Sequence, residues 1–212
     1  MREKWRGNSK LTTKSELEEI LALGKANSND VFCDLGCGKG LLCIWASHIV
    51  KHAIGIEDHK ETYQKALKNK RTTNRTNITL IPKDYDEIEK IPAIKKSTIF
   101  FCSNTLDYSF YRELQNFLYP KEVYFISQYF TPFPIKSKCY DKKWFVTKTP
   151  FKIAKTEKQW IESMFGKGKT KRDLLRFMSA LPNYKQNKKE LKNDFDYINW
   201  LKGNLTPKTS KL

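Results

Sequence analysis

The chain has 212 residues, and 40 lysines and arginines against 23 aspartates and glutamates give it a formal net charge of +17. Hydrophobic residues make up 39% of it, enough for the core of one medium-sized domain. No stretch approaches the roughly 20 apolar residues of a membrane span, and the first residues lack the apolar segment of a secretory signal. We therefore expect no membrane association, no export, and a cytoplasmic location.

The positive charge is the strongest signal in the composition. A cleft for a small cationic cofactor does not need it, whereas polyanions such as nucleic acid or nucleoprotein are attracted by it. A lysine-rich surface that is merely solvated is the alternative, and the composition leaves both open. Nucleic acid is thus a candidate partner.

The cysteines point to reduced thiols. Their number is odd, most lie in apolar stretches, and the C-x-x-x-C pair formed by Cys33 and Cys37 has no second ligand pair. Buried thiols of a cytosolic protein are expected rather than disulfides, and we predict no metal site. The five are Cys33, Cys37, Cys43, Cys102 and Cys139.

The first expected helix follows a basic and polar segment. Thr13 and Glu16 have the spacing of a capping box, in which each side chain binds the backbone N–H of the other residue. Leu17 and Ile20 begin an apolar stripe, and Gly24 is a typical helix end. The pattern predicts a helix over about 14–23.

Residues 31–57 are the stretch around which the chain is organised. They comprise an apolar strand, the loop DLGCGKG at residues 34–40, a helical pattern and a second strand that ends on Glu57. Alternate glycines let the backbone turn tightly and approach a ligand, and the next helix directs its N–H groups toward it. An acid at the second strand's tip suits a ribose. A nucleoside-containing cofactor is predicted here.

The order of residues in the loop indicates which cofactor it binds. It lacks the G-x-G-x-x-G spacing of dinucleotide sites and the G-x-x-x-x-G-K-[ST] pattern of P-loops. Asp34 precedes the glycines, and a carboxylate is a poor neighbour for a pyrophosphate and a good one for an ammonium group. The stretch resembles the first motif of class I S-adenosylmethionine-dependent methyltransferases, D/E-x-G-x-G-x-G. Another glycine-rich turn of an α/β domain is the alternative.

The resemblance implies S-adenosyl-L-methionine as cofactor. Asp34 would face its amino group, and Glu57 would accept both ribose hydroxyls. Asp84, after the third strand, would accept from the adenine amine, and Tyr85 would flank the ring, although an ordinary strand-ending turn is the alternative for both. The glycine loop would pass beneath the methionine part and the ribose, with the residues Gly36, Cys37, Gly38 and Gly40.

Strands and helices continue to alternate, which predicts a doubly wound, mainly parallel, seven-stranded α/β sheet. Residues 1–165 would form the cofactor-binding domain and residues 166–212 a basic helical extension. The later strands are expected at 78–81, 98–102, 123–127, 143–147 and 151–154. The later helices are expected at 59–70, 86–91, 109–118, 171–181 and 188–203.

The end of the fourth strand bears on the methyl acceptor. Residues 103–108 lack the Asn/Asp-Pro-Pro-aromatic sequence of enzymes that methylate base amines. The stretch FFCSNT at 100–105 instead resembles the Dot1-like protein lysine methyltransferases, and Gly55-Ile56-Glu57 is similar to their Gly-Val-Glu. The resemblance implies that Asn104 orients the cofactor or the target amine. A Thr-containing segment, Thr12 and Thr13, would close over the cofactor.

Aromatic residues would complete that site. Tyr108 and Tyr129, with Phe130 and Trp160, would form an apolar channel that favours a neutral lysine amine by desolvation. Plain core packing is the alternative for each of these side chains. The channel makes a protein lysine the first acceptor that the sequence suggests.

Three functions follow from the sequence. The first is a Dot1-like lysine methyltransferase acting on a cytosolic or DNA-associated protein. The second is an RNA methyltransferase with a ribose or ring-nitrogen target, which the charge favours. The third is a nucleic-acid-binding protein that keeps the fold without catalysis, and the intact Asp34, glycines and Glu57 argue against it.

Overall fold

The structure is a computed structural model. It describes four stretches of the chain, residues 12–103, 108–128, 135–141 and 143–179. The predictions for Asn104, Tyr129 and the helix at 188–203 lie outside the described residues. The side chains of Tyr85 and Tyr108 lie outside them too, although the backbones of both residues belong to described helices.

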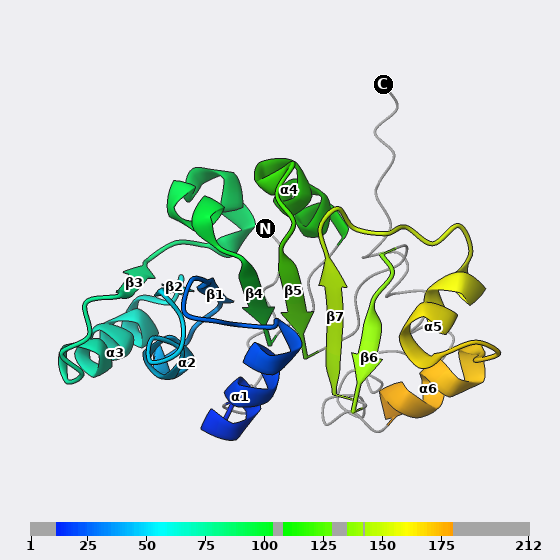
Figure 1. Cartoon of the computed structure of the whole chain (residues 1–212), viewed down its shortest axis with the longest axis horizontal. Coiled ribbons are helices and arrows are strands. Elements are labelled where there is room, and N and C mark those ends of the chain that lie inside the picture. The colour runs from blue at the N-terminus through cyan, green and yellow to red at the C-terminus, as the bar shows by residue number, and fades with distance from the viewer. Residues whose placement is uncertain (1–11, 104–107, 129–134, 142, 180–212) are drawn as a thin grey trace. The chain divides into compact units, whose positions relative to one another are not determined.

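The described strands form a seven-stranded sheet in the order β3-β2-β1-β4-β5-β7-β6 (Figure 1). The strands are β1 (Val31–Leu35), β2 (His52–Ile56), β3 (Ile78–Ile81), β4 (Ile99–Cys102), β5 (Tyr124–Ser127), β6 (Lys138–Tyr140) and β7 (Trp144–Lys148). The α-helices are α1 (Lys14–Leu23), α2 (Leu41–Ala46), α3 (Lys60–Arg71), α4 (Tyr108–Leu118), α5 (Glu157–Phe165) and α6 (Lys171–Ser179), and the 3₁₀ helices are η1 (Tyr85–Lys90) and η2 (Pro92–Lys96). The predicted doubly wound, mainly parallel α/β fold is confirmed.

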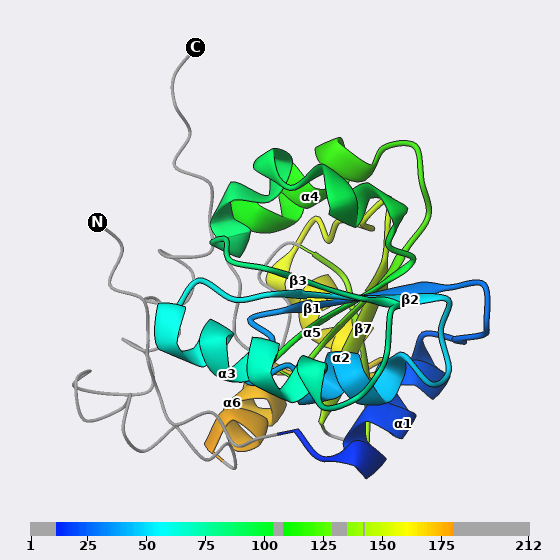
Figure 2. The ribbon, with the colours of Figure 1, turned by 90° about the vertical axis from the view of Figure 1, so that its left-hand side faces the viewer.

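Strands β1 to β4 belong to one compact unit, within residues 12–85 and 96–103, and their printed pairs are parallel. β1 lies between β2 and β4 and is buried along its whole length. Helices α1, α2 and α3 cover one face of these strands (Figure 2). Because the strands run in parallel, the residues that follow β1, β2 and β3 emerge at one edge of the sheet.

The predicted capping box is present at the start of α1. The Thr13 N–H donates to the Glu16 carboxylate at 2.7 Å, and the Glu16 N–H donates to Thr13 Oγ1 at 3.3 Å. Leu17 and Ile20 are buried. At Gly24 a side chain would lie 3.0 Å from the side chain of Ile99, so a glycine allows the helix end to approach β4.

The second compact unit carries the antiparallel strands β5, β7 and β6. Phe125 of β5 packs against α4, with its ring centroid 4.9 Å from that of Tyr111 and 6.5 Å from that of Phe110. Phe165 of α5 meets Phe145 of β7 edge to face at 6.3 Å. Aromatic pairs of this kind fix the helices on the strands.

One predicted strand is wrong. Residues 151–154 are not a strand of the sheet, because the Phe151 N–H donates to the side chain of Gln115 at 2.6 Å, and Ile153 forms only an isolated bridge with Ile135. The edge strand is β6 instead. Sequence reasoning also missed α5, whose start is capped by Thr156 Oγ1 accepting from the Gln159 N–H at 3.2 Å.

The division into residues 1–165 and 166–212 stays a prediction. Helix α6 begins where the first tail helix was expected, and its residue Leu174 is buried. Among the helices that the structure describes, none has the length and apolar character of a membrane span.

Candidate functional site

The loop between β1 and α2 turns through left-handed glycines. Gly38 has a φ of 55° and Gly40 a φ of 73°, a region that residues with a Cβ rarely adopt. A Cβ at Gly40 would also lie 3.2 Å from the Cβ of Ala66 in α3. From the same helix, Asn69 Nδ2 donates to the carbonyl of Lys39 at 3.0 Å. The helix therefore holds the loop in place.

The loop is also fixed to β2. The N–H groups of Gly36 and Cys37 both donate to the carbonyl of Ile56, at 2.9 and 2.8 Å. The Cys37 thiol faces β2, because a Cβ on Gly55 would lie 2.7 Å from Cys37 Sγ and 2.9 Å from Cys43 Sγ. Cys37 would thus meet a ligand at the loop through its backbone.

The Glu57 carboxylate links the loop to the start of α3. Its Oε2 accepts from the Gly38 N–H and its Oε1 from the His59 N–H, both at 2.9 Å. The Glu57 N–H in turn donates to the carbonyl of Ile81 at 3.1 Å. A carboxylate offers about four lone-pair positions, so both oxygens of this fixed group can still accept from two neighbouring hydroxyls.

Asp34 is a buried acid inside β1, with 3% of its surface exposed. Burial, and secondly the negative charge of Glu57, raise the pKa of Asp34 to about 7. None of the described residues donates a hydrogen bond to its carboxylate. A buried carboxylate without a partner is costly, and a cationic ligand group would relieve that cost.

A family model described as "Methyltransferase domain" matches residues 26–204. The chain belongs to this methyltransferase-domain family. S-adenosyl-L-methionine, the cofactor predicted from the sequence, is the methyl donor that a class I methyltransferase domain implies. The loop and its two acids fit it, because a cationic amino group matches Asp34 and a ribose diol matches Glu57.

Solved methyltransferase structures are similar to this domain to different extents. An RNA methyltransferase from Salinibacter ruber in complex with S-adenosyl-L-homocysteine is 20% identical with a TM-score of 0.51, over 69% of this chain and 98% of that one. A precorrin-6y C5,15-methyltransferase from Geobacter metallireducens is 15% identical with a TM-score of 0.49, over 59% and 66%. No curated protein matches the sequence. Neither the family model nor the Salinibacter ruber structure singles out the Dot1-like group.

The other predicted cofactor residues follow β3 or precede α1. Asp84 is half-buried and follows β3, as the prediction requires, and Tyr85 begins η1. Thr13 is engaged as the cap of α1, and Thr12 directly precedes it and is half-buried. Contacts of these four residues with the cofactor stay predictions.

The predicted catalytic residues fall at the limit of the described chain. Asn104 and Tyr129 lie outside it, and Tyr108 is the first residue of α4. Trp160, proposed for the lysine channel, is 5% exposed on α5, which suits core packing. The acceptor side of the site therefore stays a prediction.

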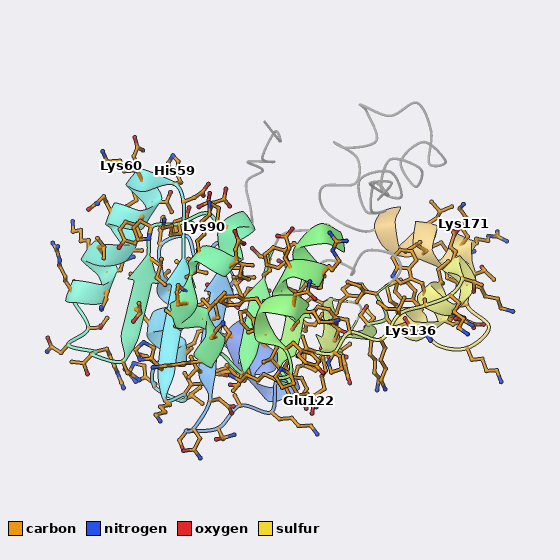
Figure 3. The ribbon with its side chains drawn as sticks, turned by 90° about the horizontal axis from the view of Figure 1, so that it is seen from above. His59, Lys60, Lys90, Glu122, Lys136 and Lys171 are labelled. Atoms are coloured by element: carbon orange, nitrogen blue, oxygen red, sulfur yellow. The ribbon has the colours of Figure 1, made fainter. Side chains whose placement is uncertain are left out.

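The helix at 59–70 was expected, but the capping role of the His59 side chain was not. His59 caps α3 and Lys60 is the first residue of this helix, and both are labelled in Figure 3. His59 Nδ1 accepts from the Thr62 N–H at 3.4 Å. The sequence alone could have suggested this cap, since a histidine nitrogen can accept a hydrogen bond from a helix N–H. It was overlooked because serine, threonine, aspartate and asparagine are the usual residues at helix caps. Among the described residues no group of three or more His, Cys, Asp or Glu side chains could hold a metal ion.

Proposed function

We propose that this methyltransferase domain binds S-adenosyl-L-methionine at residues 34–57 and methylates RNA. The observation that carries the cofactor assignment is the Glu57 carboxylate, which backbone N–H groups on both sides hold over the loop. Glu57 accepts from the two ribose hydroxyls, and Asp34 faces the amino group.

The chain's own residues mainly orient the reaction. S-adenosyl-L-methionine supplies a methyl group activated by its sulfonium centre. Transfer then depends on alignment of nucleophile, methyl and sulfur, which rigid attachment of the ribose at Glu57 supports. The two buried acids, Asp34 and Glu57, provide negative charge for a cationic cofactor.

The acceptor is assigned from charge. A net charge of +17 favours polyanions, and RNA offers ribose hydroxyls and ring nitrogens as nucleophiles. Exocyclic base amines fit less well, because residues 103–108 lack the proline pair of enzymes that act on them.

A protein lysine is the second candidate acceptor. It is supported by the sequence FFCSNT at 100–105 and its likeness to the Dot1-like group. In this group the doubled asparagine of eukaryotic members stands where this chain has Ser103 and Asn104. Asn104 would orient the amine, and Tyr108 and Tyr129 would line its channel.

Methyl-labelled S-adenosyl-L-methionine separates the two acceptors. The purified protein is incubated with cell extract, and samples are digested with RNase or with protease. Label that RNase removes and protease leaves is expected for RNA, and the opposite pattern would replace RNA by protein. Wild-type protein that binds the cofactor and labels neither would be the non-catalytic binding protein.

A matched pair of variants tests the cofactor site. Glu57→Ala should weaken cofactor binding by about 1–3 kcal/mol, because it leaves the two ribose hydroxyls without a hydrogen-bond acceptor. Glu18→Ala removes the same charge from an exposed position on α1 and should leave binding unchanged. Equal affinities of Glu57→Ala and wild type in calorimetry would contradict the assignment.

A further inference from the structure

Lysines are concentrated around the β6–β7 hairpin. Residues 135–155 contain seven lysines and a single acid, Asp141. The lysines are Lys136, Lys138, Lys142, Lys143, Lys148, Lys152 and Lys155. Lys136, labelled in Figure 3, lies two residues before β6. This is a local excess of positive charge in a part of the sequence separate from residues 34–57.

The strand register places two of these lysines, Lys138 and Lys148, on one face with aromatic rings. Tyr140 lies opposite Trp144, and Tyr124 lies opposite Lys148. Residues opposite each other, and every second residue along a strand, share a face. Lys138 is two residues from Tyr140 and therefore belongs to the same face, here called the lysine–aromatic face.

Each ring holds an ammonium group in place. Lys148 Nζ lies 4.6 Å from the ring centroid of Tyr124, Lys138 Nζ 4.8 Å from that of Tyr140, and Lys143 Nζ 4.4 Å from that of Trp144. These cation–π contacts orient a charge without neutralising it. Lys148 additionally pairs with Glu122 at the margin of the face.

The face is accessible in the described part of the chain. Lys138 and Lys148 are exposed, and Tyr124 and Tyr140 are half-buried, whereas Trp144 is only 1% exposed. Trp144 therefore serves to fix Lys143, and the two tyrosines can offer ring surface to a ligand.

We infer that the lysine–aromatic face binds single-stranded RNA, with its phosphates at the ammonium groups and bases against Tyr124 and Tyr140. Positive charge that follows the backbone, combined with aromatic side chains for the bases, is the general chemistry of single-strand binding. The inference rests on the proposed RNA acceptor and names where that RNA docks.

A second basic region supplies a matched control. At the end of α3 a cavity of about 350 Å³ is lined by Leu67, Lys70, Arg71, Asn74, Arg75 and Thr76. Cations in the last turn of a helix are favoured by its dipole, which accounts for Lys70 and Arg71 without a ligand. The variant K68Q/K70Q/R71Q removes three charges there, as K138Q/K143Q/K148Q does on the lysine–aromatic face.

Fluorescence anisotropy with a labelled single-stranded RNA of about 20 nucleotides tests the inference, measured between about 50 and 200 mM salt. K138Q/K143Q/K148Q should bind at least about tenfold more weakly, and the slope of log affinity against log salt should fall by about 2, or roughly 0.7 for each lost phosphate contact. The control triple variant should stay near wild type. Tyr140→Leu should weaken binding, whereas Tyr140→Phe should retain it.

Two readouts separate this inference from the proposed function. Calorimetry with S-adenosyl-L-methionine should give the same affinity for both triple variants and wild type, which shows that they are folded. Equal RNA affinity of the two triple variants, or no RNA binding by the wild type, would overturn the inference. RNA binding that depends on the face, with methyl label found only in protein, would retain the inference and overturn the RNA acceptor.

Discussion

The parallel strands β1 to β4 and the antiparallel strands β5, β7 and β6 carry their charges in different places. In the parallel strands an acid, Asp34, lies inside a fully buried strand and a second, Glu57, follows the next one with 9% exposure. In the antiparallel strands the charges are lysines at the surface, at Lys138 and Lys148. Acid is buried in one region and base is exposed in the other.

The difference indicates what each region binds. Buried acids cost free energy unless a ligand or a hydrogen bond compensates them, so they are retained where a small cation is enclosed. Exposed lysines cost little and act together on a large polyanion. The two regions therefore suit a small cofactor and a long polymer, and their substitutions should have effects of very different size.

The largest effect is expected at Asp34. Burial raises the pKa of Asp34 from its usual value of 3.8 to about 7 in the folded chain, so the unfolded chain loses this proton first as pH rises. The free energy of unfolding should therefore fall between about pH 4 and pH 7, by about 4 kcal/mol. Asp34→Asn removes this fall, and its stability advantage over wild type should grow across that window in urea unfolding without cofactor.

Cofactor binding should show the opposite dependence. The ionised Asp34 carboxylate is the form that attracts an amino cation, so wild-type affinity for S-adenosyl-L-methionine should rise as pH approaches about 7. Asp34→Asn should bind weakly at every pH. An Asp34→Asn stability advantage that is the same at pH 4 and pH 8 would contradict both expectations.

The next effect is expected at Gly55, where β2 packs against the cofactor loop. A Cβ there would lie 2.7 Å from Cys37 Sγ and 2.9 Å from Cys43 Sγ, so Gly55→Ala should destabilise the chain by about 1–3 kcal/mol through overpacking. Adding Cys43→Ala should restore part of the loss. Additive losses in a double-mutant cycle by urea unfolding would show that the contact with Cys43 Sγ is not the cause.

A smaller effect is expected where α1 begins. Thr13→Ala removes the acceptor of the Glu16 N–H and should cost about 1 kcal/mol, seen as a lower urea midpoint. Thr13→Ser keeps the hydroxyl and should stay near wild type. If the serine variant were as unstable as the alanine variant, the cap would not be the source of the effect.

Local sequence patterns were enough to predict the cofactor. The capping box formed by Thr13 and Glu16 can be recognised from two residues three positions apart. The loop between the first strand and its helix can be recognised in the same way, because alternate glycines permit a tight turn within a few positions. Glu57 then ends the next strand. An acid just before the glycines was enough to indicate a cationic ligand. The burial and raised pKa of Asp34 depend on its neighbours in space and appeared only in the structure.

Contacts between distant residues escaped prediction. The bond from Asn69 to the loop at Lys39 joins residues thirty positions apart, and no spacing rule indicates it. The edge of the sheet was misplaced because Phe151 has strand-like neighbours in sequence, yet its N–H is used by Gln115 of α4. Edge strands depend on such competition, so short apolar runs leave them ambiguous.

The smallest effect on stability is expected at Lys148, and it tests the comparison from the lysine side. Its ion pair with Glu122 joins side chains that are 43% and 62% exposed, and exposed pairs contribute about 0–1 kcal/mol. Lys148→Gln should therefore leave urea unfolding almost unchanged while it weakens RNA binding, and Glu122→Gln should leave RNA binding intact or strengthen it. A loss of stability as large as that of Gly55→Ala would mean that this lysine supports the fold. The exposed basic region would then no longer differ from the buried acidic region in its contribution to stability.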